Sequence, residues 1–301
     1  MRVMMSAAAS AASISVVRHL RSLGHCVIGI DAALDAEPLG RAFCDVFHVS
    51  PLASSPAYLD FLLRRLSDVD LFLPFIDEEL VTIAQSWGNI PADLARKIAV
   101  SAPNVLLDCL DKCRFQSACE TAGLPIAPTA LKAPAFFKPR FGRGGRGVMA
   151  LRDSAMFEAA RGRDGVTQRL IEGEEFTVDA IFDGAGRLIV TSPRRRIRAA
   201  GVSTIGEVMP DQALHDLAGR LGEHWQFRYA INFQVIRDGE QRDWIIELNP
   251  RLSGSGIFSA MAGCDPFAAT IALWAHESWF AQPRRLRVWR FWQEMTDERV
   301  T

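Results

Sequence analysis

The chain has 301 residues, 49% of them hydrophobic, and its 34 basic and 35 acidic residues give a formal net charge of −1 at pH 7. This length supports a large core and two or three lobes. The balanced charge disfavours a nucleic-acid partner, and no apolar run approaches the roughly 18 residues needed to span a membrane. Six cysteines without a C-x-x-C spacing favour reduced thiols and a cytoplasmic location.

The first hundred residues alternate between strand and helix patterns. Buried strands are predicted at residues 1–5, 27–31 and 69–74, and helices at residues 13–23 and 77–86. Acidic residues in the first turn of the second helix support its start. This alternation predicts a parallel sheet of Rossmann type.

A glycine-rich segment follows at residues 136–149, Phe-Phe-Lys-Pro-Arg-Phe-Gly-Arg-Gly-Gly-Arg-Gly-Val-Met. Its glycines spell G-x-G-x-x-G, but the dinucleotide fingerprint needs a helix after the loop, and here an apolar run follows. The pattern therefore predicts a strand–turn–strand hairpin whose backbone N–H groups can approach a triphosphate. Protein-kinase and Walker motifs are missing. A flexible surface loop is the alternative.

Lysine usage points to the same region. Only four of the 34 basic residues are lysines. Lys138 comes directly before the glycine hairpin, and Lys112 stands at the start of a predicted helix. A lysine is a compact point charge that suits phosphate oxygens without bidentate geometry. Both lysines are therefore candidate phosphate ligands.

Residues 244–251 read Trp-Ile-Ile-Glu-Leu-Asn-Pro-Arg. Strand alternation predicts Ile245, Glu247 and Asn249 on one face and the residues between them on the other. A carboxylate and an amide oxygen placed in this way can hold Mg²⁺ together with nucleotide phosphates. Arg251 follows a proline and can reach a phosphate or a carboxylate. The alternative is a buried strand in which the glutamate and the arginine pair for structure.

Taken in order, these blocks resemble the ATP-grasp enzymes, above all the small single-unit members related to the carbamoyl-phosphate synthase large subunit. The resemblance covers about residues 27–266. It rests on Asp-Lys at 111–112, Lys-Pro-Arg with the glycine hairpin, Gln-Arg-Leu-Ile-Glu-Gly-Glu-Glu-Phe at 168–176, Gln234, and Glu-Leu-Asn-Pro-Arg at 247–251. It implies an α/β protein with the ATP-grasp fold and an N-terminal Rossmann-like domain.

The resemblance also implies a division of the chain. Residues 1–104 would form the Rossmann-like domain, residues 105–167 the lid with the glycine hairpin, and residues 168–301 the subdomain with the metal site. A hairpin is expected there between strands at 176–182 and 188–191. Two departures stand out. Residues 6–13 are Ser and Ala where relatives carry glycines, and the segment 129–136 is short, which predicts a trimmed lid.

The resemblance implies a role for individual residues of this sequence. The groups implied to bind ATP are Lys112, Lys138, Gly142, Gly144, Gly145, the hinge residues Gln168, Arg169, Leu170 and Ile171, and the ribose-binding Glu175. The groups implied to bind two Mg²⁺ or Mn²⁺ ions are Gln234, Glu247 and Asn249. The catalytic groups are Arg251, beside the transferred phosphate, and Arg194 and Arg196, facing the acceptor site. For the last two, a solvated basic strand edge is the alternative.

The chemistry implied by the resemblance is an ATP-dependent ligase reaction. A small carboxylic acid would be activated as an acyl phosphate, and an amine or ammonia would displace the phosphate. A small-molecule kinase on the same fold and a non-catalytic ATP-binding module remain alternatives. Complete carbamoyl-phosphate synthesis is disfavoured, because it needs two ATP-grasp units and this length holds one. We expect no nucleic-acid or membrane partner and leave a homodimer open.

Overall fold

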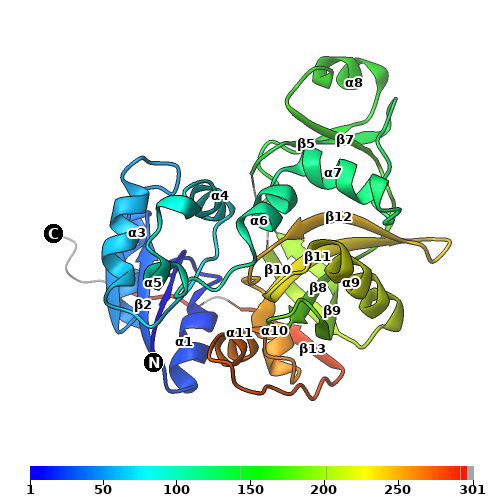
Figure 1. The fold of residues 1–301 in the computed structure, drawn as a ribbon. Coiled ribbons are helices and arrows are strands. Elements are labelled where there is room, and N and C mark those ends of the chain that lie inside the picture. The colour runs from blue at the N-terminus through cyan, green and yellow to red at the C-terminus, as the bar shows by residue number, and fades with distance from the viewer. Residues whose placement is uncertain (143, 201, 292, 297–301) are drawn as a thin grey trace.

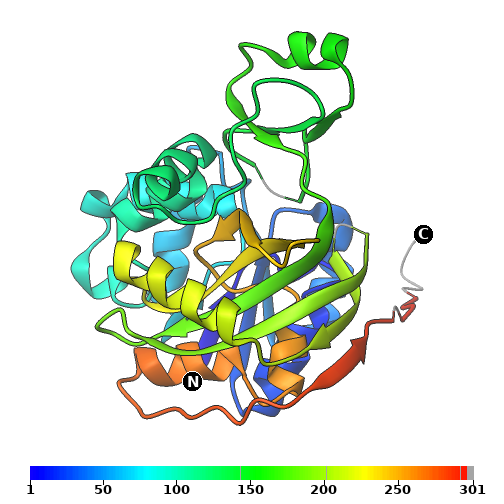
Figure 2. The ribbon, with the colours of Figure 1, turned by 90° about the vertical axis from the view of Figure 1, so that its right-hand side faces the viewer.

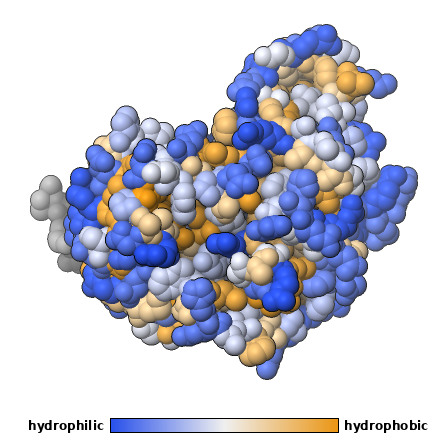
Figure 3. All heavy atoms as spheres, viewed as in Figure 1, coloured by the Kyte–Doolittle hydropathy of each residue, from blue (hydrophilic) through white to orange (hydrophobic). Residues whose placement is uncertain are grey.

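The computed structural model describes residues 1–142, 144–200, 202–291 and 293–296. Within these residues the strands form sheets of four, six and three strands (Figures 1 and 2). The three-stranded sheet stands apart from the body formed by the other two (Figure 1). Polar residues cover much of the face in Figure 3, where apolar residues show in smaller groups. None of the described helices is long and apolar enough to cross a membrane.

The first sheet is parallel and has the order β3-β2-β1-β4. Its strands are β1 (Arg2–Met5), β2 (Cys26–Asp31), β3 (Val46–Val49) and β4 (Leu71–Leu73). Its helices are α1 (Ile14–Ser22), η1 (Leu34–Ala36), α2 (Glu37–Phe43), α3 (Tyr58–Leu66), α4 (Asp77–Gln85), η2 (Trp87–Asn89) and α5 (Ala92–Ala95). The predicted strands and helices of this region are confirmed. The strands are mostly apolar because both faces of a parallel sheet are covered.

The Ser/Ala-rich turn after β1 packs into this sheet through its first serine. The Ser6 hydroxyl accepts the Phe75 N–H at 2.8 Å and donates to the Glu79 carboxylate at 2.7 Å. Tyr58 donates to the same carboxylate, and burial raises the pKa of Glu79 to about 7. Ala7 adopts a φ of 53°, the left-handed conformation that glycine usually supplies. The turn therefore keeps the conformation without the glycine.

The smallest sheet carries the glycine hairpin. Its strands are β5 (Ala135–Pro139), β6 (Met149–Leu151) and β7 (Gly165–Arg169), in the antiparallel order β6-β5-β7. The nearby helices are α6 (Pro103–Leu110), α7 (Lys112–Thr121) and α8 (Ser154–Ala160). The predicted strand–turn–strand hairpin is confirmed. It has a small apolar cluster of its own, formed by Ala135, Phe137, Leu151 and Ala160.

The six-stranded sheet has the order β12-β11-β8-β9-β10-β13. Its strands are β8 (Gly173–Phe182), β9 (Leu188–Ala200), β10 (Val202–Val208), β11 (Tyr229–Asp238), β12 (Asp243–Asn249) and β13 (Leu286–Trp289). Its helices are α9 (Gln212–Trp225), α10 (Gly256–Met261) and α11 (Pro266–Trp274). The predicted hairpin is confirmed as β8 and β9, with β9 longer than expected.

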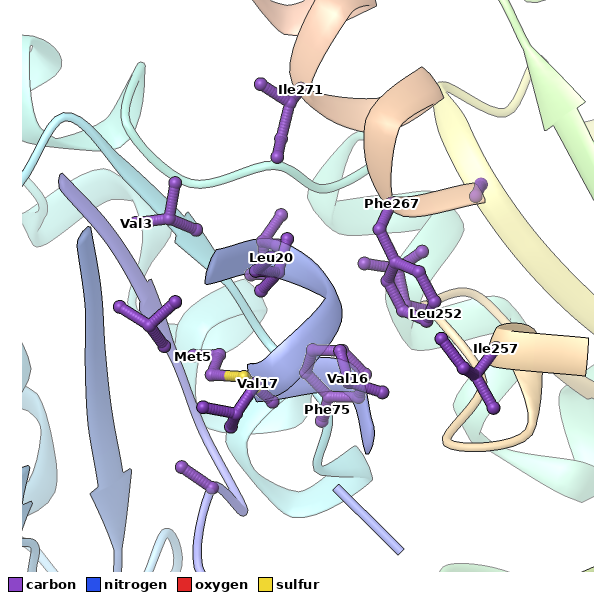
Figure 4. Packing of buried hydrophobic residues seen from close by; sticks show 14 of the residues in the cluster. Val3, Met5, Val16, Val17, Leu20, Phe75, Leu252, Ile257, Phe267 and Ile271 are labelled. Atoms are coloured by element: carbon purple, nitrogen blue, oxygen red, sulfur yellow. The ribbon is translucent and has the colours of Figure 1, made fainter. Parts of the chain in front are cut away.

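Alternation along the strands assigns these helices to opposite faces. On β8, Phe182 belongs to the apolar cluster with α9, whereas Ile181 belongs to the cluster with α10 and α11. The latter cluster continues into the first sheet, where Val3 and Val16 pack in one core with Phe267 (Figure 4). The parallel sheet and the six-stranded sheet are thus joined by a shared apolar core.

Candidate functional site

A narrow pocket lies where these parts of the chain meet. It is lined by Lys112 of α7, Lys138 of β5, Gly142 of the hairpin loop, and Glu247 and Asn249 of β12. Segments more than a hundred residues apart therefore bring five of the predicted site residues to one place.

A β-bulge in β12 changes the predicted alternation. Gln234 pairs with Glu247, but the register shifts next to this pair and leaves Ile246 as the extra residue. Ile245 is fully buried in the same apolar cluster as Leu248. The expectation that Ile245 shares a face with Glu247 is therefore wrong. The bulge resets the alternation by one residue and lets an apolar residue and a carboxylate face opposite ways.

Four polar side chains stand together on the pocket face of β11 and β12. Gln234 lies opposite Glu247, and Asn232 lies opposite Asn249. Directly opposed residues of antiparallel strands share a face. The Asn249 amide donates to Asn232 Oδ1 at 3.2 Å, and the Asn232 amide donates to the Arg251 carbonyl at 2.8 Å. Asn232 was missed from the sequence, although its spacing of two from Gln234 indicates the same face.

This donor set suits a hard divalent cation that is shared with phosphates. Mg²⁺ is usually held by one or two carboxylates, with waters and nucleotide phosphates completing the shell. The set offers one carboxylate, from Glu247, and neutral amide oxygens. No cluster of three His, Cys, Asp or Glu side chains suited to a metal occurs in the described part of the chain. A cation here would therefore depend on phosphate oxygens.

Both pocket lysines are held by backbone carbonyl groups. The Lys138 ammonium donates to the Ile246 carbonyl at 2.7 Å, and the Lys112 ammonium donates to the Gly142 carbonyl at 2.8 Å. Burial lowers the pKa of Lys138 to about 8, against the opposing effect of Glu247. A carbonyl is a weaker partner than an anion, so both ammonium groups are placed to exchange it for a phosphate oxygen.

The hairpin loop depends on its glycines for backbone conformation. The φ angles are 124° at Gly142, 63° at Gly144 and 74° at Gly145. A Cβ at any of the three would meet no atom within 4 Å, so space is not the constraint. Left-handed conformations are easily adopted only by glycine. Residue 143 of this loop lies outside the described residues.

Arg140 fixes the hairpin to the helix that carries Lys112. Its guanidinium donates to the Asp111 carboxylate at 2.8 and 2.7 Å. Asp111 also caps α7 by accepting the N–H groups of Cys113 and Arg114. Burial raises the pKa of Asp111, but the hydrogen bonds from Arg140 and the helix outweigh it, and the pKa is lowered. This link was missed from the sequence because it joins residues 29 apart.

Arg251 is absent from the lining of the narrow pocket, but it contacts two residues that line it. Its Nε donates to the carboxylate of Asp77, the first residue of α4, at 2.5 Å. Its Nη2 lies 3.4 Å from the Asn249 side-chain oxygen. Asp77 is itself a lining residue of the pocket. The ion-pair partner of Arg251 is therefore Asp77 of helix α4 and not Glu247, which contradicts the alternative in which Glu247 and Arg251 pair for structure.

The predicted hinge residues lie at the junction between the small sheet and the six-stranded sheet. Gln168 and Arg169 end β7, and Leu170 and Ile171 lead toward β8. The buried Gln168 amide donates to the Gln116 side-chain oxygen at 2.8 Å. These four residues are absent from the lining of the narrow pocket.

The two candidate arginines of β9 have different surroundings. Arg196 forms an ion pair with Glu175, the predicted ribose ligand. Arg194 is only 2% exposed, pairs with the buried Asp179 and donates to Ser259 at 2.6 Å. The alternative of a solvated strand edge is wrong, because β9 lies between β8 and β10. Arg194 is absent from the pocket lining and sits in a buried ionic network.

The chain combines a parallel sheet, a small sheet with a glycine hairpin, and an antiparallel sheet with polar side chains on β11 and β12. This combination is the ATP-grasp fold. Residues 163–294 match a family model described as ATP-grasp in the biosynthetic pathway with Ter operon. The chain has the ATP-grasp fold, and both this family model and its structural neighbours belong to ATP-grasp proteins.

Known relatives agree with this assignment. The chain is 26% identical over 234 residues to the carbamoyl phosphate synthase large chain of Deinococcus radiodurans, covering 63% of this chain and 22% of that protein. It is 25% identical over 313 aligned positions to that of Thermotoga sp. strain RQ2, covering 86% and 27%. The chain thus spans about a quarter of the length of the curated relatives it matches.

Solved structures share the fold at lower identity. N5-carboxyaminoimidazole ribonucleotide synthetase of Thermus thermophilus superposes with a TM-score of 0.72 at 16% identity, covering 95% of this chain and 82% of that one. The biotin carboxylase domain of Hydrogenobacter thermophilus 2-oxoglutarate carboxylase, in complex with MgADP and bicarbonate, gives 0.70 at 17%, covering 93% and 71%. An L-amino acid ligase of Bacillus licheniformis gives 0.67 at 17%, covering 90% and 74%.

Proposed function

We propose that this chain is an ATP-dependent carboxylate–amine ligase that acts on a small molecule. The observation that carries the proposal is the convergence of Lys112, Lys138, Glu247 and Asn249 on one pocket. In this proposal residues 1–104 contribute to the acceptor site, residues 105–167 form the lid, and residues 168–301 carry the metal site. The structural neighbours include an ADP–Mg²⁺ complex and an amino acid ligase, which supports the choice of reaction.

The nucleotide is bound chiefly by positive charge and by the hairpin. Lys112 and Lys138 exchange their carbonyl partners for phosphate oxygens. The loop from Gly142 closes over the phosphates with its backbone N–H groups. The hinge backbone at residues 168–171 holds the adenine edge. Glu175, which is paired with Arg196, takes the ribose hydroxyls.

Mg²⁺ fits the polar face formed by Gln234, Glu247 and Asn249. When bound there, it neutralises charge on the phosphate oxygens during transfer. The protein holds the side chains of these residues in the orientation that the ion needs. Asn249 is fixed by its bond to Asn232, and Glu247 is turned toward the pocket by the bulge.

The reaction proceeds in two displacements. A carboxylate oxygen of the substrate attacks the γ-phosphorus of ATP, and ADP leaves with the bridging oxygen. The amine then attacks the acyl carbon, loses a proton, and expels inorganic phosphate. Arg251 stabilises the negative charge that develops on the transferred group. The closed hairpin excludes water, which would otherwise hydrolyse the acyl phosphate.

Hydroxylamine trapping tests this proposal. The protein is incubated with ATP, Mg²⁺ and, one at a time, amino acids and other small carboxylic acids, with hydroxylamine in large excess over any other amine. The expected result is a hydroxamate formed in equal amount with ADP, because hydroxylamine intercepts an acyl phosphate. A phosphorylated product that is stable to hydroxylamine would show an alcohol or amine acceptor and would replace the ligase with a kinase.

The pKa of Lys138 predicts a pH dependence of ATP affinity. The charged form binds phosphate, and it predominates in the free protein below the pKa of about 8. Above this pH, binding must take up a proton, so affinity should fall by up to about tenfold per pH unit. Lys138→Arg stays charged and should remove the dependence. Calorimetric titration with ATP at several pH values measures this dependence. If the affinity of Lys138→Arg fell with pH as steeply as that of the wild type, Lys138 would not be the phosphate ligand.

A further inference from the structure

Two carboxylates line the narrow pocket, and the proposed function uses only one of them. Glu247 of β12 belongs to the proposed metal set, whereas Asp77 is the first residue of α4. Among the described lining residues, Asp77 alone comes from the part of the chain that forms the parallel sheet. Its side chain is only 9% exposed. A carboxylate that is buried to this extent needs a charged partner.

A single guanidinium is attracted by both carboxylates. Arg251 Nε donates to Asp77 Oδ1 at 2.5 Å, and Arg251 Nη1 donates to the Leu252 carbonyl at 3.2 Å. Burial lowers the pKa of Arg251, but the attraction by Asp77 and, more weakly, by Glu247 outweighs it, and the pKa is raised. The two lining carboxylates therefore compete for one arginine, and in the structure Asp77 binds it.

The residues on both sides of Asp77 are anchored to the parallel sheet and to α3. The Ser6 hydroxyl, directly after β1, accepts the Phe75 N–H at 2.8 Å and donates to the Glu79 carboxylate at 2.7 Å. Glu79 is fully buried and also accepts a hydrogen bond from the Tyr58 hydroxyl of α3. Asp77 is thus held two residues before and two residues after its own position, so its carboxylate is a fixed partner for Arg251.

The backbone next to Arg251 is held by the apolar core that joins the two larger sheets. Leu252 belongs to the same cluster as Phe75, and Phe75 stacks on Phe267 of α11 with the ring centroids 6.3 Å apart (Figure 4). This core therefore brings Asp77 and Arg251 together although they lie 174 residues apart in the sequence.

We propose that Asp77 is a positioning residue that holds Arg251 away from Glu247 and thereby leaves the Glu247 carboxylate to the divalent cation. Without the Asp77 charge, Arg251 would be a buried cation, and Glu247 would be the remaining carboxylate of the pocket lining. A charge-assisted pair between these two would have to break before a cation could bind. The inference rests on the proposed function in one respect, the assignment of Glu247 as a metal ligand.

Binding of Mn²⁺ to the full chain in the presence of ADP tests this role without turnover. Electron paramagnetic resonance measures free Mn²⁺, and the Mn²⁺–ADP complex is measured separately. Asp77→Asn should weaken Mn²⁺ binding about tenfold or more, because the pair between Arg251 and Glu247 must then be given up. Asp77→Glu, which keeps the charge, should restore most of the affinity. In an Arg251→Met protein, which has no competing guanidinium, the addition of Asp77→Asn should weaken binding less than about threefold.

The Arg251→Met background separates positioning from a direct effect of the Asp77 charge on the ion. A direct effect would cost at least as much Mn²⁺ affinity in this background, because the arginine no longer screens the aspartate, and that result would overturn the proposal. Wild-type Mn²⁺ affinity in Asp77→Asn would also overturn it. Asp77→Ser is measured in parallel, and circular dichroism identifies which of the two uncharged variants is folded and can be used.

The matched control is Asp60→Asn. Asp60 is an acidic residue in the first turn of α3, but it is exposed and does not line the pocket, so its variant should bind Mn²⁺ as the wild type does. Glu247→Gln tests the proposed function separately, because wild-type Mn²⁺ affinity in that variant would contradict the metal site itself. Weaker binding in Glu247→Gln together with unchanged binding in Asp77→Asn would contradict only the role of Asp77.

Discussion

Replacing Glu247 by glutamine should reduce ATP-dependent hydroxamate formation at least about a hundredfold, the usual cost of removing an electrostatic contact to the reacting group. Glu247 supplies the carboxylate of the proposed metal set, which otherwise consists of neutral amides. Glutamine keeps the size and one oxygen of the side chain but removes the negative charge. The free energy of unfolding should change little, because Glu247 is only part-buried.

The matched control is Glu174→Gln on β8, which is separated from β12 by β11. Glu174 pairs with Arg195 at the exposed surface and is absent from the pocket lining. Its variant should form hydroxamate at the wild-type rate. A Glu247→Gln protein that kept more than about a tenth of the wild-type rate would show that the carboxylate takes no part in phosphoryl transfer.

Replacing Arg194 by alanine should lower the free energy of unfolding by about 3–5 kcal/mol, the range for breaking one side of a buried ion pair. Arg194 and Asp179 are almost completely buried, and Arg194 also bonds Ser259 and Ser255. Without the guanidinium, the Asp179 carboxylate is left as an uncompensated buried charge. Urea unfolding followed by circular dichroism measures the loss.

Two further variants decide whether the lost stability comes from the unpaired charge of Asp179. The double variant Asp179→Leu, Arg194→Met removes both charges and keeps similar volumes, so it should recover most of the stability. Arg187→Met breaks a pair in which Arg187 is 82% exposed and should cost below about 1 kcal/mol. A double variant as unstable as Arg194→Ala would place the cost in lost packing instead.

Several helices and strands could be predicted from the local sequence pattern alone. The strand–helix alternation of residues 1–86 predicted β1, β2, β4, α1 and α4, because apolar runs and helix starts are local signals. The same holds for the glycine hairpin and for the pairing of β8 with β9.

Features that depend on contacts between distant segments were not predictable in this way. The bulge at Ile246 depends on how β12 pairs with β11, so alternation alone assigned Ile245 to the wrong face. The partner of Arg251 is Asp77, 174 residues away. A cavity of about 670 Å³ is lined by residues of α1, α2 and α10 and by residues 288–291 and 293–295, which no local spacing brings together. Arg194 was expected at an accessible site, and its burial follows from the central position of β9.

Calorimetric titration of Lys138→Ala with MgATP tests most directly whether the narrow pocket holds the nucleotide. Loss of one charged hydrogen bond to phosphate should cost about 1.5–3 kcal/mol, which corresponds to roughly ten- to a hundredfold weaker binding. Lys132→Ala is the control, because that lysine is exposed and is absent from the pocket lining. We expect the wild type and the control to bind one MgATP per chain with equal affinity. Only Lys138→Ala should bind MgATP more weakly. Equal affinity in all three proteins would contradict the account.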